Sequence, residues 1–354
     1  ADDRNLFRVD VMEPKAERSP LGDMRLGKVQ RRDVARVVDR CIARGAPVTA
    51  TRLLARLRAA FNWAVSRGYV TANPCLGIKP PVSYRERARE RVLDTQEIRA
   101  FYAVLPTCGL HLSHQRILRL QLLLGQRLGE VCGMTKRELN AAECLWTIPA
   151  NRAKNGREHI VPLPPEAREI ISEAIHDADQ SARDNPALAS VFKTEFVFPS
   201  KDLRKPITAN IVSHALERVQ HLPPEHDGPL SKHRPKSLPP RVAFGFMHPQ
   251  TGEPNPFTSH DLRRTLATQT EKLGVTLRVI SKLLNHTEAK SVTDAIYARA
   301  ELMAERFEAL VRWERALKDI RDGKDPLASS PNTFRDIEAR ILGNQPIRIE
   351  AATR

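Results

Sequence analysis

One stretch near the C-terminal end organises the chain: it reads Thr258-Ser-His-Asp-Leu-Arg-Arg-Thr265, then an apolar helical run, then Leu283-Leu-Asn-His286 and Ala295-Ile-Tyr-Ala-Arg299. Its reactive side chains stand on short helical segments that can converge on one point: His260, Arg263, His286 and Tyr297. This set suits attack on a phosphodiester, because phosphoryl transfer needs its charge neutralised and both apical oxygens served by a nucleophile and a proton donor. Arg263 can bind phosphate oxygens through its forked guanidinium, the histidines can donate or relay protons, and Tyr297 can attack and stay attached. Each residue alone is more often structural, so the rest of the chain decides the interpretation.

Charge is the second informative property. The chain has 57 Lys and Arg residues against 42 Asp and Glu residues, a net charge of +15 and a pI near 10. An excess of this size indicates a polyanionic partner. Residues 25–91 alone contain 16 basic and 4 acidic residues, a net charge of +12. A basic but inert surface would not concentrate charge in this way.

Length and cysteine usage set the broad class. A chain of 354 residues is long enough for two domains with a substantial core. The five cysteines are dispersed, with no C-x-x-C pair and no histidine at metal-ligand spacing, which is typical of reduced thiols in a cytosolic protein without a metal site. No apolar run is long enough to span a membrane, and no signal-peptide core is present. We therefore expect a cytoplasmic, nucleoid-associated protein without membrane contact. The chain begins at Ala, which suggests a processed or shortened form.

The basic segment predicts a small helical domain. Apolar residues at helical spacing indicate a first helix over 31–44, ended by Gly45 and Pro47, and a second helix capped by Thr49 and ended by Gly68. The expected buried stripes are Val34, Val37, Val38, Cys41 and Ile42, then Leu53, Leu57, Phe61 and Ala64. Arg52, Arg56 and Trp63 share another face of the second helix. Basic residues beside an aromatic suit a DNA backbone, although an isolated solvated face is the commoner reading.

A charged linker follows, with four arginines that alternate with other residues: Arg85, Arg87, Arg89 and Arg91. This alternation is too polar for a core element and predicts an extended strap that wraps a duplex. Residues 221–256 are Pro-rich and without periodicity, which predicts a surface loop.

The second domain supplies two more basic residues. A helix that starts with a capping box at 94–97 and an almost wholly apolar helix over 117–124 precede Arg127. Arg127 lies between two glycines and three positions before Glu130, which could orient it through an ion pair. Two β-like runs, 144–149 and 158–162, enclose a basic turn with Lys154 at its tip. After Tyr297, a helix is expected to bury Met303, Phe307, Leu310, Leu317 and Ile320, with Trp313 beside the stripe.

Over about residues 25–320 the chain resembles the tyrosine recombinases, the phage-integrase family. The family pattern is present in order and at matching spacing as Arg127, Lys154, His260, Arg263, His286 and Tyr297. The segments Gly125-Gln-Arg-Leu-Gly-Glu-Val131 and His260-Asp-Leu-Arg-Arg-Thr265 are especially similar to integrases of prophages and genomic islands. Two features depart from the simplest members: the long 221–256 connection, and the absence of an arm-binding domain before residue 25.

The resemblance implies a mainly α fold with a small antiparallel β-sheet (α+β), in which a SAM-like helical core-binding domain precedes the catalytic domain. The expected organisation is a linker or arm over 1–24, the core-DNA-binding domain over 25–84, a basic linker over 85–91, the catalytic domain over 92–321 and a tail over 322–354.

The resemblance also implies the roles of the six residues. Arg127 and Arg263 would bind the scissile phosphate. Tyr297 would attack it to give a 3′-phosphotyrosyl link, and Lys154 would protonate the leaving oxygen. His260 would assist proton transfer at the tyrosine, and His286 would hydrogen-bond the phosphate. The covalent link conserves the bond energy, so no cofactor, ATP or metal is expected.

The implied function is site-specific recombination of double-stranded DNA by a homotetramer on paired sites, with a directionality factor as a further partner. Two alternatives remain. A type IB topoisomerase would make the same link but relax DNA without exchanging partners. A non-catalytic DNA-binding regulator would explain the charge but not the six-residue set.

Overall fold

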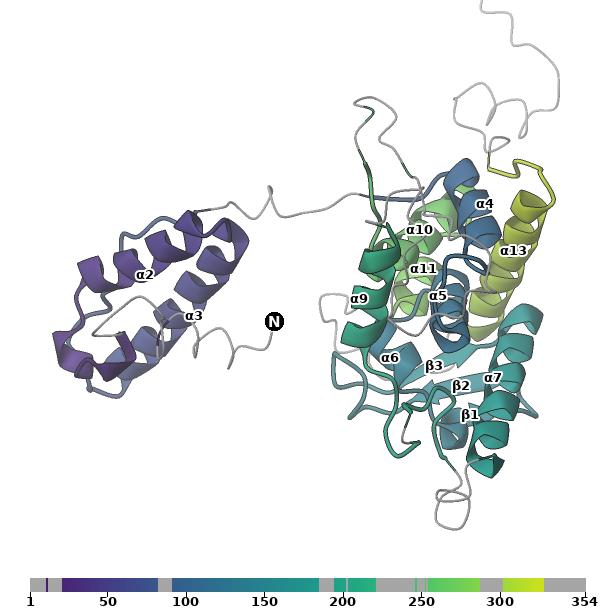
Figure 1. The fold of residues 1–354 in the computed structure, drawn as a ribbon, viewed down its shortest axis with the longest axis horizontal. Helices are drawn as coiled ribbons and strands as arrows, with labels where there is room; N and C mark the ends of the chain where they lie inside the picture. The colour runs from purple at the N-terminus through teal and green to yellow at the C-terminus, as the bar shows by residue number, and fades with distance from the viewer. Residues whose placement is uncertain are drawn as a thin grey trace, which may run out of the picture. The chain divides into compact units, whose positions relative to one another are not determined.

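The computed structural model describes residues 11, 21–81, 91–184, 194–201, 203–220, 246, 252, 254–286 and 302–327. The chain divides into two compact units, Ala1–Glu90 and Arg91–Arg354, which are considered separately below (Figure 1). Tyr297, the linker residues Arg85, Arg87 and Arg89, the predicted loop over 221–256 apart from a few positions, and the chain after Leu327 lie outside the described residues.

The N-terminal unit is a helical pair, as expected. Its elements are η2 (Leu21–Asp23), η3 (Leu26–Lys28), α2 (Arg31–Ala43) and α3 (Pro47–Ser66). The predicted stripes are buried, with one exception: Ile42 is 41% exposed. The predicted cap at Thr49 is wrong, because α3 already begins at Pro47 with Ala46 as its N-cap. Proline suits the first helical position, since its missing N–H would have no partner there.

The second unit is mostly helical around a small sheet. Its elements are α4 (Thr95–Val104), α5 (Leu112–Leu124), α6 (Leu128–Cys132), η5 (Lys136–Glu138), β1 (Leu139–Asn140), β2 (Leu145–Ile148), β3 (His159–Pro162), α7 (Pro165–Arg183), α9 (Ala209–Gln220), α10 (Ser259–Lys272), α11 (Leu277–Leu283) and α13 (Met303–Arg321). The strands pair antiparallel in the order β1-β2-β3, with Trp146 opposite Val161. The expected fold class and the hairpin are both confirmed.

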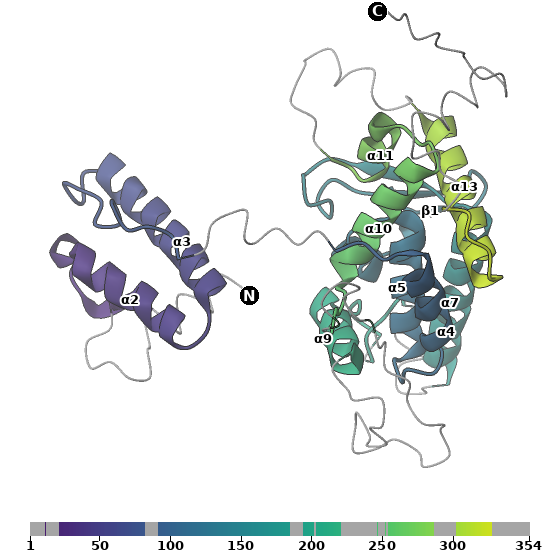
Figure 2. The ribbon, with the colours of Figure 1, turned by 90° about the horizontal axis from the view of Figure 1, so that it is seen from above.

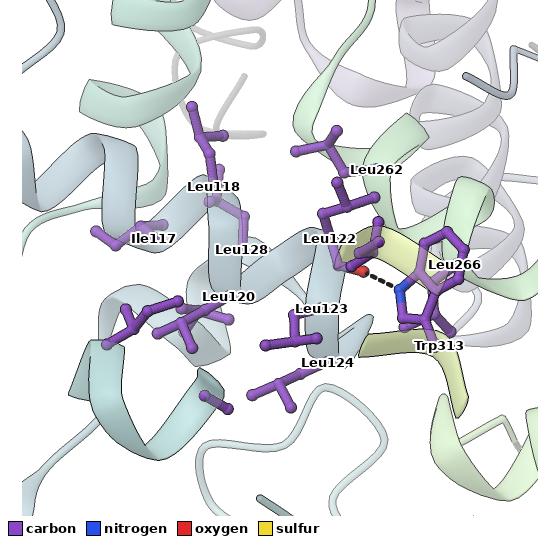
Figure 3. Packing of buried hydrophobic residues seen from close by; sticks show 14 of the residues in the cluster. Ile117, Leu118, Leu120, Leu122, Leu123, Leu124, Leu128, Leu262, Leu266 and Trp313 are labelled. Atoms are coloured by element: carbon purple, nitrogen blue, oxygen red, sulfur yellow. Dashed lines mark hydrogen bonds between the residues drawn. The ribbon is translucent and has the colours of Figure 1, made fainter. Parts of the chain in front are cut away.

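Helix α5 lies at the centre of this unit. It packs against α10, α7 and α13 (Figure 2). Its apolar residues are fully buried, as the all-apolar run predicted: Ile117, Leu118, Leu120, Leu122, Leu123 and Leu124. Leu262 and Leu266 of α10 and Trp313 of α13 complete the same cluster (Figure 3). Because the apolar residues of its last two turns are all buried, α5 fixes the position of the residues that follow its C-terminal end.

Helix α13 belongs to the core of its own unit, which corrects two expectations. Trp313 is fully buried, and its indole N–H donates to the Leu122 carbonyl over 2.9 Å, whereas Phe307 is 40% exposed. The packing also continues past residue 321: Arg99 donates to the Lys324 carbonyl over 3.1 Å, and Leu327 is buried. The described packing of this unit therefore continues to Leu327, past the expected start of the tail at residue 322.

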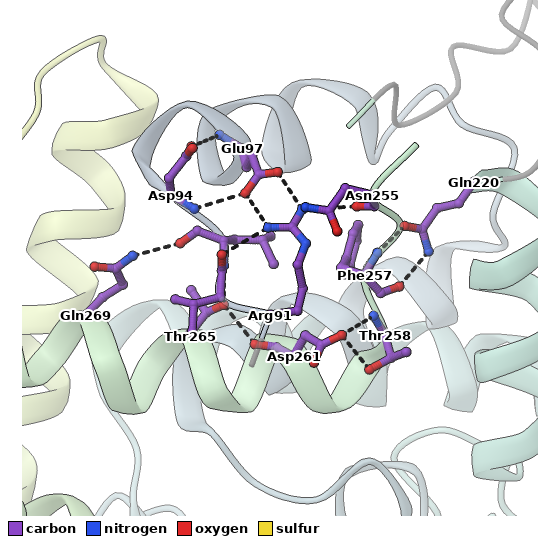
Figure 4. A network of polar contacts seen from close by, with 12 residues as sticks. Arg91, Asp94, Glu97, Gln220, Asn255, Phe257, Thr258, Asp261, Thr265 and Gln269 are labelled. Carbon is purple, nitrogen blue, oxygen red and sulfur yellow. Dashed lines mark hydrogen bonds and ion pairs between the residues drawn. The ribbon is translucent and has the colours of Figure 1, made fainter. Parts of the chain in front are cut away.

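Residues Arg91 to Leu93, at the end of the linker, are bound to side chains of α4 and α10 (Figure 4). The predicted capping box is present, since Glu97 N donates to Asp94 over 2.8 Å. Arg91, which was predicted to contact DNA, has a side chain that is 10% exposed and forms a bidentate ion pair with Glu97. The next backbone is held by buried side chains of α10, because Leu93 N donates to Thr265 Oγ1 over 2.9 Å and Leu93 O accepts from Gln269 over 2.7 Å.

Within the part of the chain that the structure describes, no helix combines the length and the apolar character needed to cross a bilayer.

Candidate active site

The first part of the site is the sharp turn after α5. Gly125 ends the helix at φ +67°, and a Cβ there would lie 2.9 Å from Leu284 Cδ2, so only glycine fits without displacement. Arg127 then starts α6, and its guanidinium donates to Glu130 Oε1 over 3.0 Å. Glu130 is 4% exposed and also accepts from the Arg127 backbone N–H. The predicted orienting role of Glu130 is thus confirmed for this structure.

The second part is the N-terminal half of α10. Thr258 caps the helix in a reciprocal box with the buried Asp261, and Arg264 donates to the same carboxylate over 2.9 Å. One turn of helix then places His260 at the surface and Arg263 inside, 3% exposed. Arg263 donates to the Gly125 carbonyl over 2.6 Å and also to the Leu284 carbonyl. These two bonds tie α10 to the ends of α5 and α11.

The third part is the C-terminal end of α11, where three successive carbonyls are satisfied by side chains from elsewhere. Leu283 O accepts from Gln126 Nε2 over 2.9 Å and from His159 Nε2 over 3.1 Å, which requires the Nε2–H tautomer of His159. Leu284 O accepts from Arg263, and Asn285 O accepts from Asn155 over 3.3 Å. A helix end leaves such carbonyls without partners inside the helix. The donors therefore hold the residue that follows, His286.

Mutual electrostatic effects show that five of the six predicted residues share one neighbourhood. Desolvation and the charges of Arg264 and Arg263 lower the pKa of His260, and Lys154 adds to the effect. Desolvation, Arg263, Arg127 and His260 lower the pKa of His286 in the same direction. Arg263 acts on both rings, Lys154 acts on His260 and Arg127 acts on His286. Both histidines are accordingly neutral at pH 7, whereas Arg263 stays charged, since burial and Arg127 lower its pKa only to about 10.

His159 lies beneath this neighbourhood, at the start of β3. It is 6% exposed, and its pKa falls to about 3 because of burial and the nearby charge of Arg306. Arg306 itself is buried on α13 and donates to the Ile160 carbonyl. A permanently neutral His159 can therefore serve as a fixed donor to α11.

Sequence reasoning missed the supporting residues of the site: Gln126, His159, Asn155 and Asn285. Only Gln126 carried a local signal, as a polar residue directly after the apolar run and before Arg127. The others pair with partners more than a hundred positions away in the chain, for which spacing gives no clue.

The remaining predicted residues fall in two groups. Arg52 and Arg56 are exposed on α3, together with Trp63, which is 56% exposed and lies 5.6 Å from the ring of Tyr69. Tyr297, Arg85, Arg87 and Arg89 lie outside the described residues. Among the residues that are described, no group of three or more His, Cys, Asp or Glu side chains is arranged to hold a metal ion.

Comparison with known families agrees with the two units. Residues 91–302 match the phage integrase family, and residues 15–80 match the phage integrase central domain. The chain belongs to the phage integrase family. The expectation drawn from the motifs is therefore confirmed.

Individual members of the family show how far the likeness extends. Prophage integrase IntZ of Escherichia coli K12 is 29% identical over 56% of this chain and 46% of its own length. Prophage integrase IntA of the same organism is 22% identical over 86% of this chain and 62% of its own length. The chain thus spans about half to three-fifths of these curated relatives. Tyrosine recombinase XerD of Lacticaseibacillus casei is 24% identical over 69% of this chain and 70% of its own length.

Solved structures support the fold. A lambda integrase dimer (residues 75–356) bound to a COC′ core site superposes with a TM-score of 0.51 at 19% identity, covering 75% of this chain and 82% of that one. The Tn1549 transposon integrase (residues 82–397) in complex with circular intermediate DNA gives a TM-score of 0.51 at 17% identity, covering 87% and 93%. The small sheet and the surrounding helices are thus an integrase fold.

Proposed function

We propose that this chain is the core-binding and catalytic part of a site-specific DNA recombinase that cuts and rejoins duplex DNA through a 3′-phosphotyrosyl intermediate. The observation that supports it best is the shared electrostatic neighbourhood of Arg127, Lys154, His260, Arg263 and His286 in a member of the phage integrase family. Two arginines and a lysine around two neutral histidines provide fixed positive charge and uncharged proton carriers. Fixed positive charge stabilises the transferring phosphoryl group, and uncharged imidazoles can accept or relay protons.

In the proposed reaction, Arg127 and Arg263 bind the non-bridging oxygens of the scissile phosphate. Tyr297 Oη attacks the phosphorus and gives up its proton with the help of His260, whose lowered pKa leaves the ring free to accept it. The bond from phosphorus to O5′ breaks, and Lys154 supplies the proton that O5′ needs. His286 hydrogen-bonds the phosphate. Attack by a 5′-hydroxyl on the phosphotyrosine reverses these steps. One phosphoester bond forms for each one that breaks, so the reaction needs neither ATP nor an added metal.

DNA binding is proposed to depend on the N-terminal unit and the linker. The exposed pair Arg52 and Arg56 would contact phosphates, with Trp63 beside them, and the linker arginines Arg85, Arg87 and Arg89 would extend the contact. Arg91 is removed from this set because it is bound to Glu97. The proposed boundaries are a core-binding domain over 25–84 and a catalytic domain from Arg91 onward, at the junction between the two compact units.

Assembly is part of the same proposal. Strand exchange joins two duplexes and therefore uses four active sites, so a homotetramer on paired sites is the expected working form. A lambda integrase tetramer has been solved on a Holliday junction. A directionality factor is a further proposed partner.

The test begins with DNA trapped on the full chain in its host under denaturing conditions, whose sequence identifies the target. With that target, a suicide substrate should give a covalent adduct, and two duplexes should exchange strands. Arg127→Ala should lose the adduct, whereas Arg315→Ala, at an exposed position of α13, should keep it. Relaxation of supercoiled DNA without exchange would instead support a type IB topoisomerase. Binding without any adduct would support a regulator.

A further inference from the structure

Two of the proposed reacting residues are each adjacent in sequence to an asparagine, and those two asparagines bind each other. Asn155, which follows Lys154, donates from Nδ2 to Asn285 Oδ1 over 2.8 Å and to Asn285 O over 3.3 Å. Asn285, which precedes His286, donates back to Asn155 Oδ1 over 3.3 Å. The residues are 130 positions apart. We call this reciprocal amide pair, Asn155 with Asn285, the asparagine bridge.

We propose that Asn155 and Asn285 are positioning residues, which hold the acid Lys154 at the phosphate site through the asparagine bridge. The inference rests on the proposed function, because it assigns a partner to the acid of that reaction. Neither asparagine touches the reacting atoms in this role.

The Asn285 side of the bridge is anchored. Asn285 has φ +50°, and its backbone N–H donates to Lys282 O over 3.2 Å, while His286 N donates to Ser281 O over 3.0 Å. The two carbonyls before it are bound by Gln126, His159 and Arg263. Any group that binds Asn285 is therefore bound to the fixed end of α11.

The Lys154 side is a turn whose Ala153 is buried in the core and whose backbone is closed by Gly156 N, which donates to Ala153 O over 2.9 Å. Lys154 is exposed and lies between the ends of β2 and β3. On its N-terminal side, Arg152 ties the turn to Glu138 and to the Glu130 carbonyl over 2.8 and 3.1 Å. On its C-terminal side, the asparagine bridge gives the second attachment. These attachments on either side of Lys154 restrict the backbone from which its side chain extends, and neither of them involves the ammonium group itself.

The chemistry of the bridge suits this task. Each primary amide has a donor and an acceptor, so two of them satisfy each other reciprocally. Amides do not titrate, so the bridge keeps its strength across the pH range in which the histidines change charge. Proton donation to O5′ depends steeply on position, and a misplacement of about 1 Å can cost on the order of 100-fold in rate.

The experiment uses the full chain with Asn155→Ala and Asn285→Gly. Glycine keeps the left-handed backbone at 285 and removes only the amide. Each variant is tested for DNA affinity, melting temperature and single-turnover cleavage of two suicide substrates. One has the ordinary O5′ leaving group, and the other has sulfur there, which leaves without a proton.

We expect both variants to cleave the oxygen substrate roughly 10- to 100-fold more slowly than wild type, and the sulfur substrate at close to the wild-type rate. DNA affinity should not change. The double variant should be no slower than the slower single variant, since both remove the same bridge. Lys154→Ala gives the reference for complete loss of the acid. Asn140→Ala, which removes an asparagine from the neighbouring β1–β2 turn, should cleave both substrates normally.

Equal slowing on both substrates would overturn the inference, because it would show a general structural defect. Wild-type rates on the oxygen substrate would overturn it as well. Both results leave the proposed function standing, because wild type still forms the adduct. If wild type forms no adduct on either substrate, the proposed function itself fails, and the inference fails with it.

Discussion

At the scale of single residues, the site depends on side chains that bind backbone carbonyls. Gln126, His159, Arg263 and Asn155 together satisfy the last carbonyls of α11. Leu283 O has two of these donors, whereas the buried Leu284 O accepts from Arg263, and a buried acceptor that loses its partner costs about 1–3 kcal/mol. The position of His286 therefore depends on Gln126, His159 and Asn155, which have no proposed contact with the phosphate, as well as on Arg263, which does.

His159 makes stability depend on pH. Its pKa in the folded protein is about 3, against about 6.5 in the unfolded chain. Between these pKa values the imidazole is protonated in the unfolded chain but not in the folded protein. The contribution of His159 to the free energy of unfolding is therefore fully present above pH 6.5 and is lost as the pH falls toward 3. His159→Gln keeps a donor and removes the titration. As the pH is lowered from 6.5 to 4.5, the free energy of unfolding of wild type should therefore fall more steeply than that of His159→Gln, by up to about 1.4 kcal/mol per pH unit.

Denaturant unfolding at several pH values measures this difference. His214→Gln is the matched control, since that side chain is 74% exposed on α9, and it should follow wild type. Parallel curves for wild type and His159→Gln would show that His159 is not the source.

The proposed reacting residues stand out in the sequence, whereas the residues that support them do not. Phosphoryl transfer restricts the residue types at the reacting positions, so His260 with Arg263, or Arg127 between two glycines, stands out. A carbonyl accepts from any donor, and nothing local pairs Gln126 with Leu283, 157 positions away. Arg91 shows a related limit: it continues the alternation of Arg85 to Arg89 in the sequence, and only the fold shows that Glu97 binds it.

At the scale of elements, the buried run of α5 fixes the turn at Gly125. The almost wholly apolar pattern over 117–124 predicted a helix buried on all sides, because a helix that is apolar all round is stable only in a core. The pattern was less informative for α13, where the spacing favoured Phe307 and put Trp313 beside the stripe. The indole is buried because its N–H finds the Leu122 carbonyl, a contact that spacing cannot show.

Gly125→Ala should destabilise the catalytic unit and slow cleavage. The new Cβ would be 2.9 Å from Leu284 Cδ2 and would sit on a backbone with φ +67°, at a cost of about 1–3 kcal/mol. The carbonyl that Arg263 binds would move with it. Gly129→Ala is the control, because nothing lies within 4 Å of that position. Melting temperature and adduct rate are measured for both. Equal values for the two variants would contradict the assigned role of the turn.

Arg91→Ala should lower stability without changing the salt dependence of DNA binding. The substitution leaves Glu97, whose side chain is 14% exposed, without its bidentate partner. Breaking a buried ion pair in this way costs about 3 kcal/mol. Urea unfolding and DNA affinity at several salt concentrations give the two readouts. A flatter salt dependence with unchanged stability would return Arg91 to the DNA-contacting set.

At the scale of the whole molecule, the excess of basic residues is concentrated in the N-terminal unit and the linker. Residues 25–91 include 16 basic and only 4 acidic residues. Composition alone therefore predicted a polyanionic partner. Composition could not show which arginine side chains are hydrogen-bonded to other groups within the fold. Arg58, for example, lies on α3 with Arg52 and Arg56 but donates to the Ile78 carbonyl over 2.9 Å.

Arg52→Gln and Arg56→Gln should each weaken binding to duplex DNA and flatten its salt dependence. Each lost phosphate contact removes roughly 0.9 from the slope of log affinity against log salt. Arg58→Gln should leave the slope unchanged in protein that remains folded, since its guanidinium is used internally. Fluorescence anisotropy across a salt series measures all three. Unchanged slopes for the first two variants would place the DNA on another face.

The most direct test of the account is the identity of the residue that becomes joined to DNA. Tyr297 is the only tyrosine after the His260–Arg263 motif, and trypsin would release it in the peptide 291–299. After cleavage of a suicide substrate, digestion with nuclease and trypsin followed by mass spectrometry should find the nucleotide on that peptide. Tyr297→Phe should bind DNA as wild type does and give no adduct. A nucleotide on any other peptide, or a normal adduct yield from Tyr297→Phe, would contradict the account.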